Sequence, residues 1–105
     1  MREIEFRAWV NHSFSHGYVY FTAESGLYGF TNPILEQYTG LKDKNGVKIF
    51  EGDIYNYKKE VGTIEFKMGC FWCVSSDDAF ELYSMHMYTE IIGNIHENPE
   101  LLIDE

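Results

Sequence analysis

Residues 37–57, QYTGLKDKNGVKIFEGDIYNY, constrain the fold more than any other part of the chain. They hold two turns close together, an Asp-Lys-Asn-Gly turn at residues 43–46 and a Gly-Asp corner at Gly52 and Asp53. Asn and Gly tolerate the positive φ that tight hairpin turns require. At the corner we expect Gly52 to take the sharp bend and Asp53 to bond the backbone beyond it. Because apolar residues alternate around both turns, the stretch predicts short antiparallel strands.

Strand-like alternation recurs on both sides of this stretch. Residues 4–10 alternate charged and apolar side chains and residues 18–22 form a second β-type run, so we expect a hairpin with one charged face. Residues 34–38 fit an extended segment or a short helical turn equally well. Residues 64–74 show the clearest period of two, and Gly69 predicts a bend, a bulge or a turn between two shorter strands there. Residues 89–96 predict the final strand.

The C-terminal residues Asn98, Pro99 and Glu100 predict the start of a helix of one or two turns, with Asn as the cap. We expect its leucines to pack on the preceding strands. Short strands, frequent turns and 17% aromatic residues predict a mainly β fold. The expected architecture is a small, partly open β-barrel, SH3-like in its back half, with N-terminal strands and a short C-terminal helical turn. At 105 residues we expect one domain, with strands and a loop at 1–36 and a barrel-like core at 37–105.

The formal net charge of −9, from 17 acidic and eight basic residues, limits the classes of partner that this protein can bind. Such a chain is repelled by nucleic acid and by anionic membranes, which argues against both as the main partner. No apolar run approaches the roughly 20 residues of a membrane helix, and the N-terminus lacks a signal sequence. The two cysteines are close together rather than spread as a disulfide framework. We therefore expect a cytoplasmic protein.

Three blocks, in this order along the chain, carry a further resemblance: REIEFRAW at residues 2–9, the central stretch at 37–57, and EIIGNIHENPELL at 90–102. Together they cover roughly two fifths of the chain and resemble the YopX family of small phage- and prophage-associated proteins. The family has no established activity or agreed catalytic residues, so the resemblance implies no site residue. It implies a compact, mainly β protein that is encoded by a mobile element and works inside a bacterial cell. Many members have a longer, lysine-rich middle section, whereas residues 18–34 here hold no lysine.

Cys70 and Cys73 form a Cys-x-x-C pair, but no second pair exists to complete a zinc site. On one strand their sulfurs point to opposite faces, so we interpret them as structural thiols rather than as a metal or redox site. Met85-His86-Met87 cannot turn all three side chains to one ion for the same reason. No nucleophile elbow, Walker motif or dinucleotide fingerprint is present. We therefore expect no catalytic residues, no cofactor and no bound metal.

Two kinds of binding remain as hypotheses. The first is a non-enzymatic interaction module that assembles with itself or docks on a host or phage protein, with Trp9, Tyr55 and Tyr57 as candidate contacts. The second is nucleic-acid binding through a basic turn, whose candidate residues are Lys42, Lys44 and Lys48. The simpler interpretation of these lysines is that they keep a hairpin edge from pairing with other chains. The overall charge favours the first hypothesis.

Overall fold

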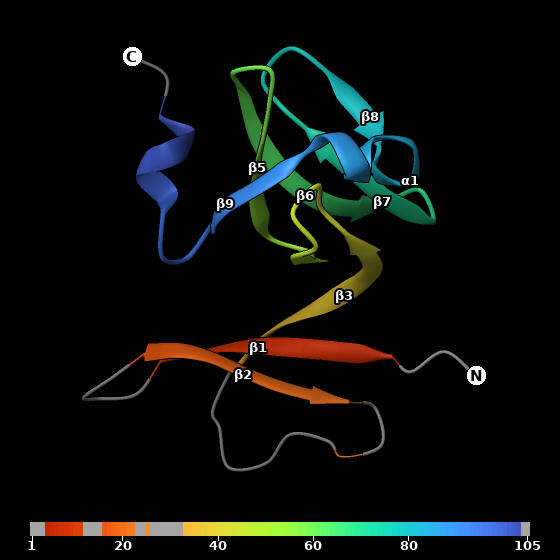
Figure 1. Ribbon diagram of the computed structural model, residues 1–105. Coiled ribbons are helices and arrows are strands. Elements are labelled where there is room, and N and C mark those ends of the chain that lie inside the picture. Colours follow the sequence, from red (N-terminus) through yellow and green to blue (C-terminus); the bar gives the residue numbers. More distant parts are fainter. Residues whose placement is uncertain (1–3, 12–15, 23–24, 26–32, 104–105) are drawn as a thin grey trace. The chain divides into compact units, whose positions relative to one another are not determined.

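The computed structural model describes residues 4–11, 16–22, 25 and 33–103. These residues form two antiparallel sheets with short helical turns, so the prediction of a mainly β fold is confirmed (Figure 1). The chain divides into two compact units, residues 1–38 and 39–105, which are described one at a time.

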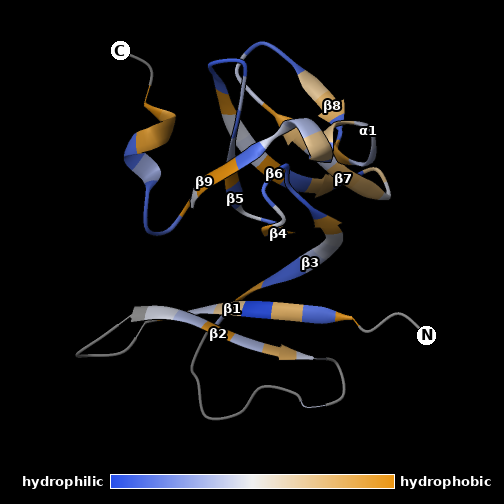
Figure 2. Cartoon of the chain, in the orientation of Figure 1, coloured by the Kyte–Doolittle hydropathy of each residue, from blue (hydrophilic) through white to orange (hydrophobic). Residues whose placement is uncertain are grey.

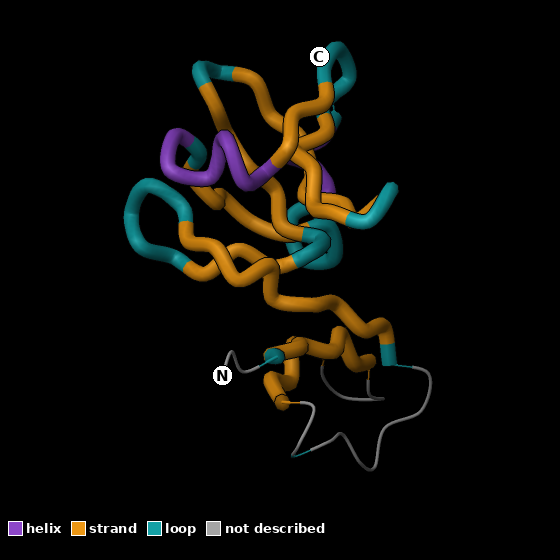
Figure 3. The backbone as a smooth tube through the Cα atoms, turned by 90° about the vertical axis from the view of Figure 1, so that its right-hand side faces the viewer, coloured by secondary structure: helices purple, strands orange, loops and turns teal. Residues whose placement is uncertain are grey.

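The elements in chain order are β1 (Glu5–Asn11), β2 (His16–Thr22), β3 (Ile34–Lys42), β4 (Lys48–Phe50), β5 (Asp53–Tyr57), β6 (Glu60–Lys67), β7 (Cys70–Val74), β8 (Ala79–Glu81), α1 (Leu82–Met85), the 3-10 turn η1 (His86–Tyr88), β9 (Glu90–Asn94) and the 3-10 turn η2 (Pro99–Leu102). The strand orders are β2-β1-β3-β4 and β8-β7-β6-β5-β9. Both sheets are open within the described residues, where no closed barrel forms. The helical segments are short beside the strands (Figure 3).

The first unit is built on the expected hairpin of β1 and β2, with Glu5 opposite Thr22. The start of β3 pairs with β1, so the ambiguous segment at 34–38 is extended. The charged face of β1 is partly buried. Arg7 is only 5% exposed, because its Nε donates to Oε1 of Glu36 at 2.8 Å. The Tyr18 hydroxyl donates to the same oxygen at 2.7 Å, so the buried carboxylate has two donors.

The turn at residues 43–46 forms as expected, and Gly46 has φ 80°. The Gly52-Asp53 corner also forms, with Gly52 at φ 87°. The Asp53 carboxylate accepts the backbone N–H of Phe50 at 2.8 Å. Asp53 thus bonds the backbone that precedes the corner. The bond ties the end of β4 to the start of β5.

The clearest period in the sequence is split between β6 and β7 by a two-residue turn at Met68 and Gly69, which have φ 52° and 81°. Of the bend, bulge or turn that Gly69 predicted, the structure has the turn between two shorter strands. The hairpin pairs even-numbered residues with odd-numbered ones, as in Ile64 opposite Cys73. The two strands therefore present opposite parities to the core, and residues 64–74 do not share one continuous face.

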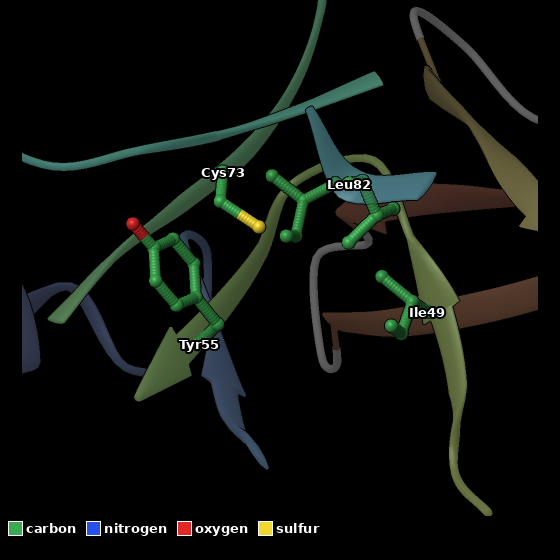
Figure 4. Packing of buried hydrophobic residues seen from close by; sticks show 5 residues of the cluster. Ile49, Tyr55, Cys73 and Leu82 are labelled. Atoms are coloured by element: carbon green, nitrogen blue, oxygen red, sulfur yellow. The ribbon is translucent and has the colours of Figure 1, made fainter. Parts of the chain in front are cut away.

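The core of the second unit is a cluster of five buried side chains, one each from β4, β5, β6, β7 and α1: Ile49, Tyr55, Ile64, Cys73 and Leu82. Figure 4 shows four labelled members converging, with the Tyr55 hydroxyl at the end of the ring away from Ile49. Each is at most 2% exposed. The cluster contains side chains from β4 and α1 as well as from β5, β6 and β7 of the five-stranded sheet. It therefore packs β4 and α1 against that sheet.

The C-terminal end follows the predicted pattern only in part. Pro99 does open the helical turn η2, but Asn98 makes no side-chain cap to it. Its Oδ1 instead accepts the backbone N–H of Asn94 at 3.2 Å, which fixes the tight return after β9. Leu101 and Leu102 do not pack fully on the strands, since they stay 38% and 40% exposed.

Candidate interaction site

The three lysines of the basic-turn hypothesis, Lys42, Lys44 and Lys48, are all exposed. The turn that carries them is held to the segment before β9, because Lys44 donates its backbone N–H to the Thr89 carbonyl at 3.0 Å. An acidic side chain also contacts this turn. Asn45 donates to the Glu90 carboxylate at 3.4 Å. The turn is therefore not a uniformly basic surface.

The three candidate aromatic contacts differ in accessibility. Trp9 is half-buried and packs edge-on against Tyr18, with ring centroids 5.2 Å apart. Tyr57 is half-buried against the core cluster, and the Lys58 ammonium lies 5.4 Å from its ring centroid. Tyr55 is only 2% exposed and belongs to the core. Burial removes Tyr55 from the surface residues that a partner could contact.

Cys70 and Cys73 are free thiols on opposite faces of β7. Cys73 is buried in the core, and burial raises the pKa of its thiol from the ordinary 9.0 to about 12. A thiol with that pKa is protonated at neutral pH and is a poor nucleophile and a poor metal ligand. Across the described residues no group of three His, Cys, Asp or Glu side chains could hold a metal ion.

A groove of about 580 Å³ lies between the β6–β7 hairpin and η2, entirely within the second unit. It is lined by residues 59–63 and 65 of the β5–β6 turn and β6, by residues 74–77 at and after the end of β7, and by residues 101–103 at and after the end of η2. Figure 2 shows η2 changing from hydrophilic at its start to hydrophobic at its end. One wall is therefore aliphatic, with Ile103 71% exposed beside the two leucines.

The opposite wall of the groove is acidic, and two of its carboxylates, those of Glu60 and Glu65, accept hydrogen bonds from neighbouring hydroxyl groups. Thr63 donates to Oε2 of Glu65 at 2.8 Å, and Ser75 donates to Oε1 of Glu60 in a short hydrogen bond. Asp77 is exposed at the rim, and Lys59 is the lining residue with positive charge. Three carboxylates against one ammonium make this groove negative.

The groove is connected to the core through Tyr55. Burial chiefly raises the pKa of the Tyr55 hydroxyl to about 12, the charges of Cys73, Glu60 and Asp78 also raise it, and a hydrogen bond with Ser75 lowers it. Gly62 has no Cβ and so leaves room for the Tyr55 hydroxyl and the Val74 carbonyl beside its backbone. A Cβ on Gly62 would lie 2.8 Å from the Tyr55 hydroxyl and 2.1 Å from the Val74 carbonyl oxygen.

Sequence reasoning did not find this groove. Its walls come from three separated segments, and each one has an ordinary composition for a turn, a strand end or a short helix. The one available indication was the pair of leucines after Pro99, which we expected to pack on the preceding strands. Leu101 and Leu102 instead form an exposed aliphatic wall.

The fold and composition define the class as small, mainly β, strongly acidic proteins. Family comparison places the chain more closely: a model described as "YopX protein" matches residues 7–103. The chain therefore belongs to the YopX family, and the resemblance seen in its sequence is confirmed.

Among solved structures, protein EF1440 from Enterococcus faecalis is similar, with 28% sequence identity and a TM-score of 0.64 over 95% of this chain and 98% of that chain. A search of curated proteins gave no match. In the part of the chain that the structure describes, no helix is long and apolar enough to cross a membrane.

Proposed function

We propose that this YopX-family chain is a non-enzymatic protein-interaction module on a small, partly open barrel-like scaffold. It assembles with itself or docks on a host or phage protein in the cytoplasm of a bacterial cell. The groove between the β6–β7 hairpin and η2 is the observation that carries the proposal. Its aliphatic wall stays exposed, which is typical of surfaces that pack against a partner.

The polar groups of the groove support binding rather than catalysis. Its carboxylates accept hydrogen bonds from Thr63 and Ser75, as positioned binding groups do. A general base needs a nucleophile or a substrate proton within hydrogen-bond reach and a pKa tuned to its task. Tyr55 is buried next to the lining residue Ser75, and burial chiefly raises the pKa of its hydroxyl to about 12, so the hydroxyl stays protonated at neutral pH and is a weak base.

Two measurements test the proposal. Light scattering after size exclusion, over a range of protein concentrations, reports self-association. A pull-down from bacterial lysate, followed by mass spectrometry, reports other partners. We expect either a concentration-dependent dimer or a protein retained by the wild type and lost from the Leu101→Ser/Leu102→Ser variant. A monomer that retains no protein at any concentration would contradict the proposal.

A further inference from the structure

We infer that the groove between the β6–β7 hairpin and η2 binds an extended segment of another protein in which Lys or Arg side chains stand beside aliphatic ones. This inference rests on the proposed function and names the chemistry of the partner. The argument combines the shape of the groove, its two chemically different walls and the way its carboxylates are held.

The aliphatic wall sets the first requirement on the occupant. Leu101, Leu102 and Ile103 are 38%, 40% and 71% exposed, and all three line the groove. Val61 and Val74 line it from the strands. Covering these side chains removes apolar surface from water, which favours an occupant that brings aliphatic groups of its own.

The acidic wall sets the second requirement. Glu60 and Glu65 each accept a neighbouring hydroxyl through one carboxylate oxygen, which leaves each carboxylate oriented and still able to accept further donors. A guanidinium or ammonium group is the donor that such an oxygen binds best. Because the groove is negative within a chain of net charge −9, it attracts a cationic segment at long range as well.

The same charges argue against other occupants. A phosphate backbone or an anionic lipid surface would meet Glu60, Glu65 and Asp77 and be repelled. A small metal ion would need convergent ligands, and no such group of three exists among the described side chains. A groove of about 580 Å³ with one long aliphatic wall suits a few residues of peptide.

The test uses the intact protein and defined synthetic peptides, followed by 15N–1H NMR titration. One short peptide alternates lysine and valine, a second replaces lysine with glutamate, and a third replaces valine with serine. We expect the first alone to shift the amide signals of the groove, at Val61, Thr63 and Leu102, and its affinity to fall as salt is added. Equal binding of the glutamate peptide, or no shift with the lysine peptide at millimolar concentration, would overturn the inference.

Variants with matched controls locate the binding. Glu60→Gln/Glu65→Gln keeps the hydroxyl contacts but removes two charges. We expect it to lower the affinity for the lysine peptide about three- to tenfold, the range for two partly exposed ion pairs. Glu81→Gln removes an exposed charge on β8 outside the groove and should leave the affinity unchanged. Leu101→Ser/Leu102→Ser should weaken binding at least as much, while Met87→Ser, also an exposed apolar site, should not.

The same variants separate this inference from the proposed function. If a lysate partner or a dimer is retained equally by wild type and by Glu60→Gln/Glu65→Gln, the chain is an interaction module and the groove is not its basic-segment site. If the wild type neither self-associates nor retains a partner, and the peptide fails to bind, both proposals are wrong. Circular dichroism and the unfolding midpoint of each variant show whether its fold is intact.

Discussion

The Asp43 carboxylate ties the central turn to the last strand, because its Oδ2 accepts the backbone N–H of Ile91 at 2.8 Å. Its Oδ1 accepts the backbone N–H groups of Asn45 at 2.8 Å and Val47 at 2.9 Å. The side chain is only 5% exposed. One carboxylate thus satisfies three backbone donors and physically joins two of the three family-like blocks, residues 37–57 and 90–102. A buried acceptor of this kind fixes the turn and the position of β9 together.

Replacement of Asp43 by Ala should therefore destabilise the second unit. Three partly buried backbone N–H groups lose a charged acceptor, and we expect the free energy of unfolding to fall by about 3 kcal/mol. Lys44→Ala, at the exposed neighbouring position, should change it by less than about 0.5 kcal/mol. Urea unfolding followed by circular dichroism measures both. Equal stability of the two variants would show that the three hydrogen bonds contribute nothing.

The buried ion pair of Arg7 and Glu36 predicts strongly non-additive substitutions. The side chains are 6% and 4% exposed, and the guanidinium lies 4.1 Å from the Tyr18 ring centroid. Removing one partner leaves a buried charge without its opposite charge, so Arg7→Met or Glu36→Leu should each cost about 3 kcal/mol. The double variant should cost less than the two single changes together. Unfolding is followed by Trp9 fluorescence in a Trp72→Phe background, and simple additivity would contradict the prediction.

The local turns could be predicted from the sequence because their chemistry is local. Gly46, Gly52 and Gly69 all adopt the positive φ that glycine allows at little cost, and each turn forms where a glycine stands. The hairpin of β1 and β2 followed from alternation alone. Patterns of this kind depend on neighbours within a few residues, so a single sequence contains the information.

The long-range relations could not be predicted in the same way. Arg7 looks like a solvated charge until Glu36, 29 residues away, is placed against it. Which side chains of residues 64–74 face the core depended on whether Gly69 made a bend or a full turn. The alternation of apolar and polar residues cannot decide between these two. The groove needed three segments to meet, and none of them has a distinctive motif. Side-chain partners far apart in sequence decide burial, and periodicity does not report them.

Gly62 gives a sharp test of the close contact between β6 and the end of β7. Gly62→Ala would place a Cβ 2.1 Å from the Val74 carbonyl oxygen. The backbone would have to move to relieve this steric clash. We expect a loss of about 2 kcal/mol or more, with the Tyr55 side chain displaced. Gly17→Ala is the matched control, because nothing lies within 4 Å of its added Cβ. Thermal unfolding of the two variants should differ clearly, and similar midpoints would contradict the packing.

The basic-turn hypothesis predicts an anionic partner, whereas the groove is inferred to bind a cationic one. The two can therefore be tested separately. We expect no salt-dependent mobility shift of single- or double-stranded nucleic acid, even at low ionic strength where phosphate attraction is strongest. The exposed lysines at 42, 44 and 48 are opposed by the net charge of −9. A shift at low salt that disappears in the Lys42→Gln/Lys44→Gln/Lys48→Gln variant would establish nucleic-acid binding and displace our preferred function.

The buried Cys73 thiol and Tyr55 hydroxyl predict that the protein loses stability in alkali. Burial raises the pKa of Cys73 from 9.0 to about 12 and that of Tyr55 from 10.0 to about 12. Both groups stay protonated in the folded chain at a pH where the unfolded chain releases the protons, so ionisation favours unfolding. The contribution of these two groups to stability should be constant from neutral pH to about pH 9 and fall between about pH 9 and 12. In urea titrations, Tyr55→Phe and Cys73→Ala should each lower stability at neutral pH but flatten this alkaline decline, because each removes one of the two linked protons. A decline of unchanged slope in both variants would show that neither group is responsible.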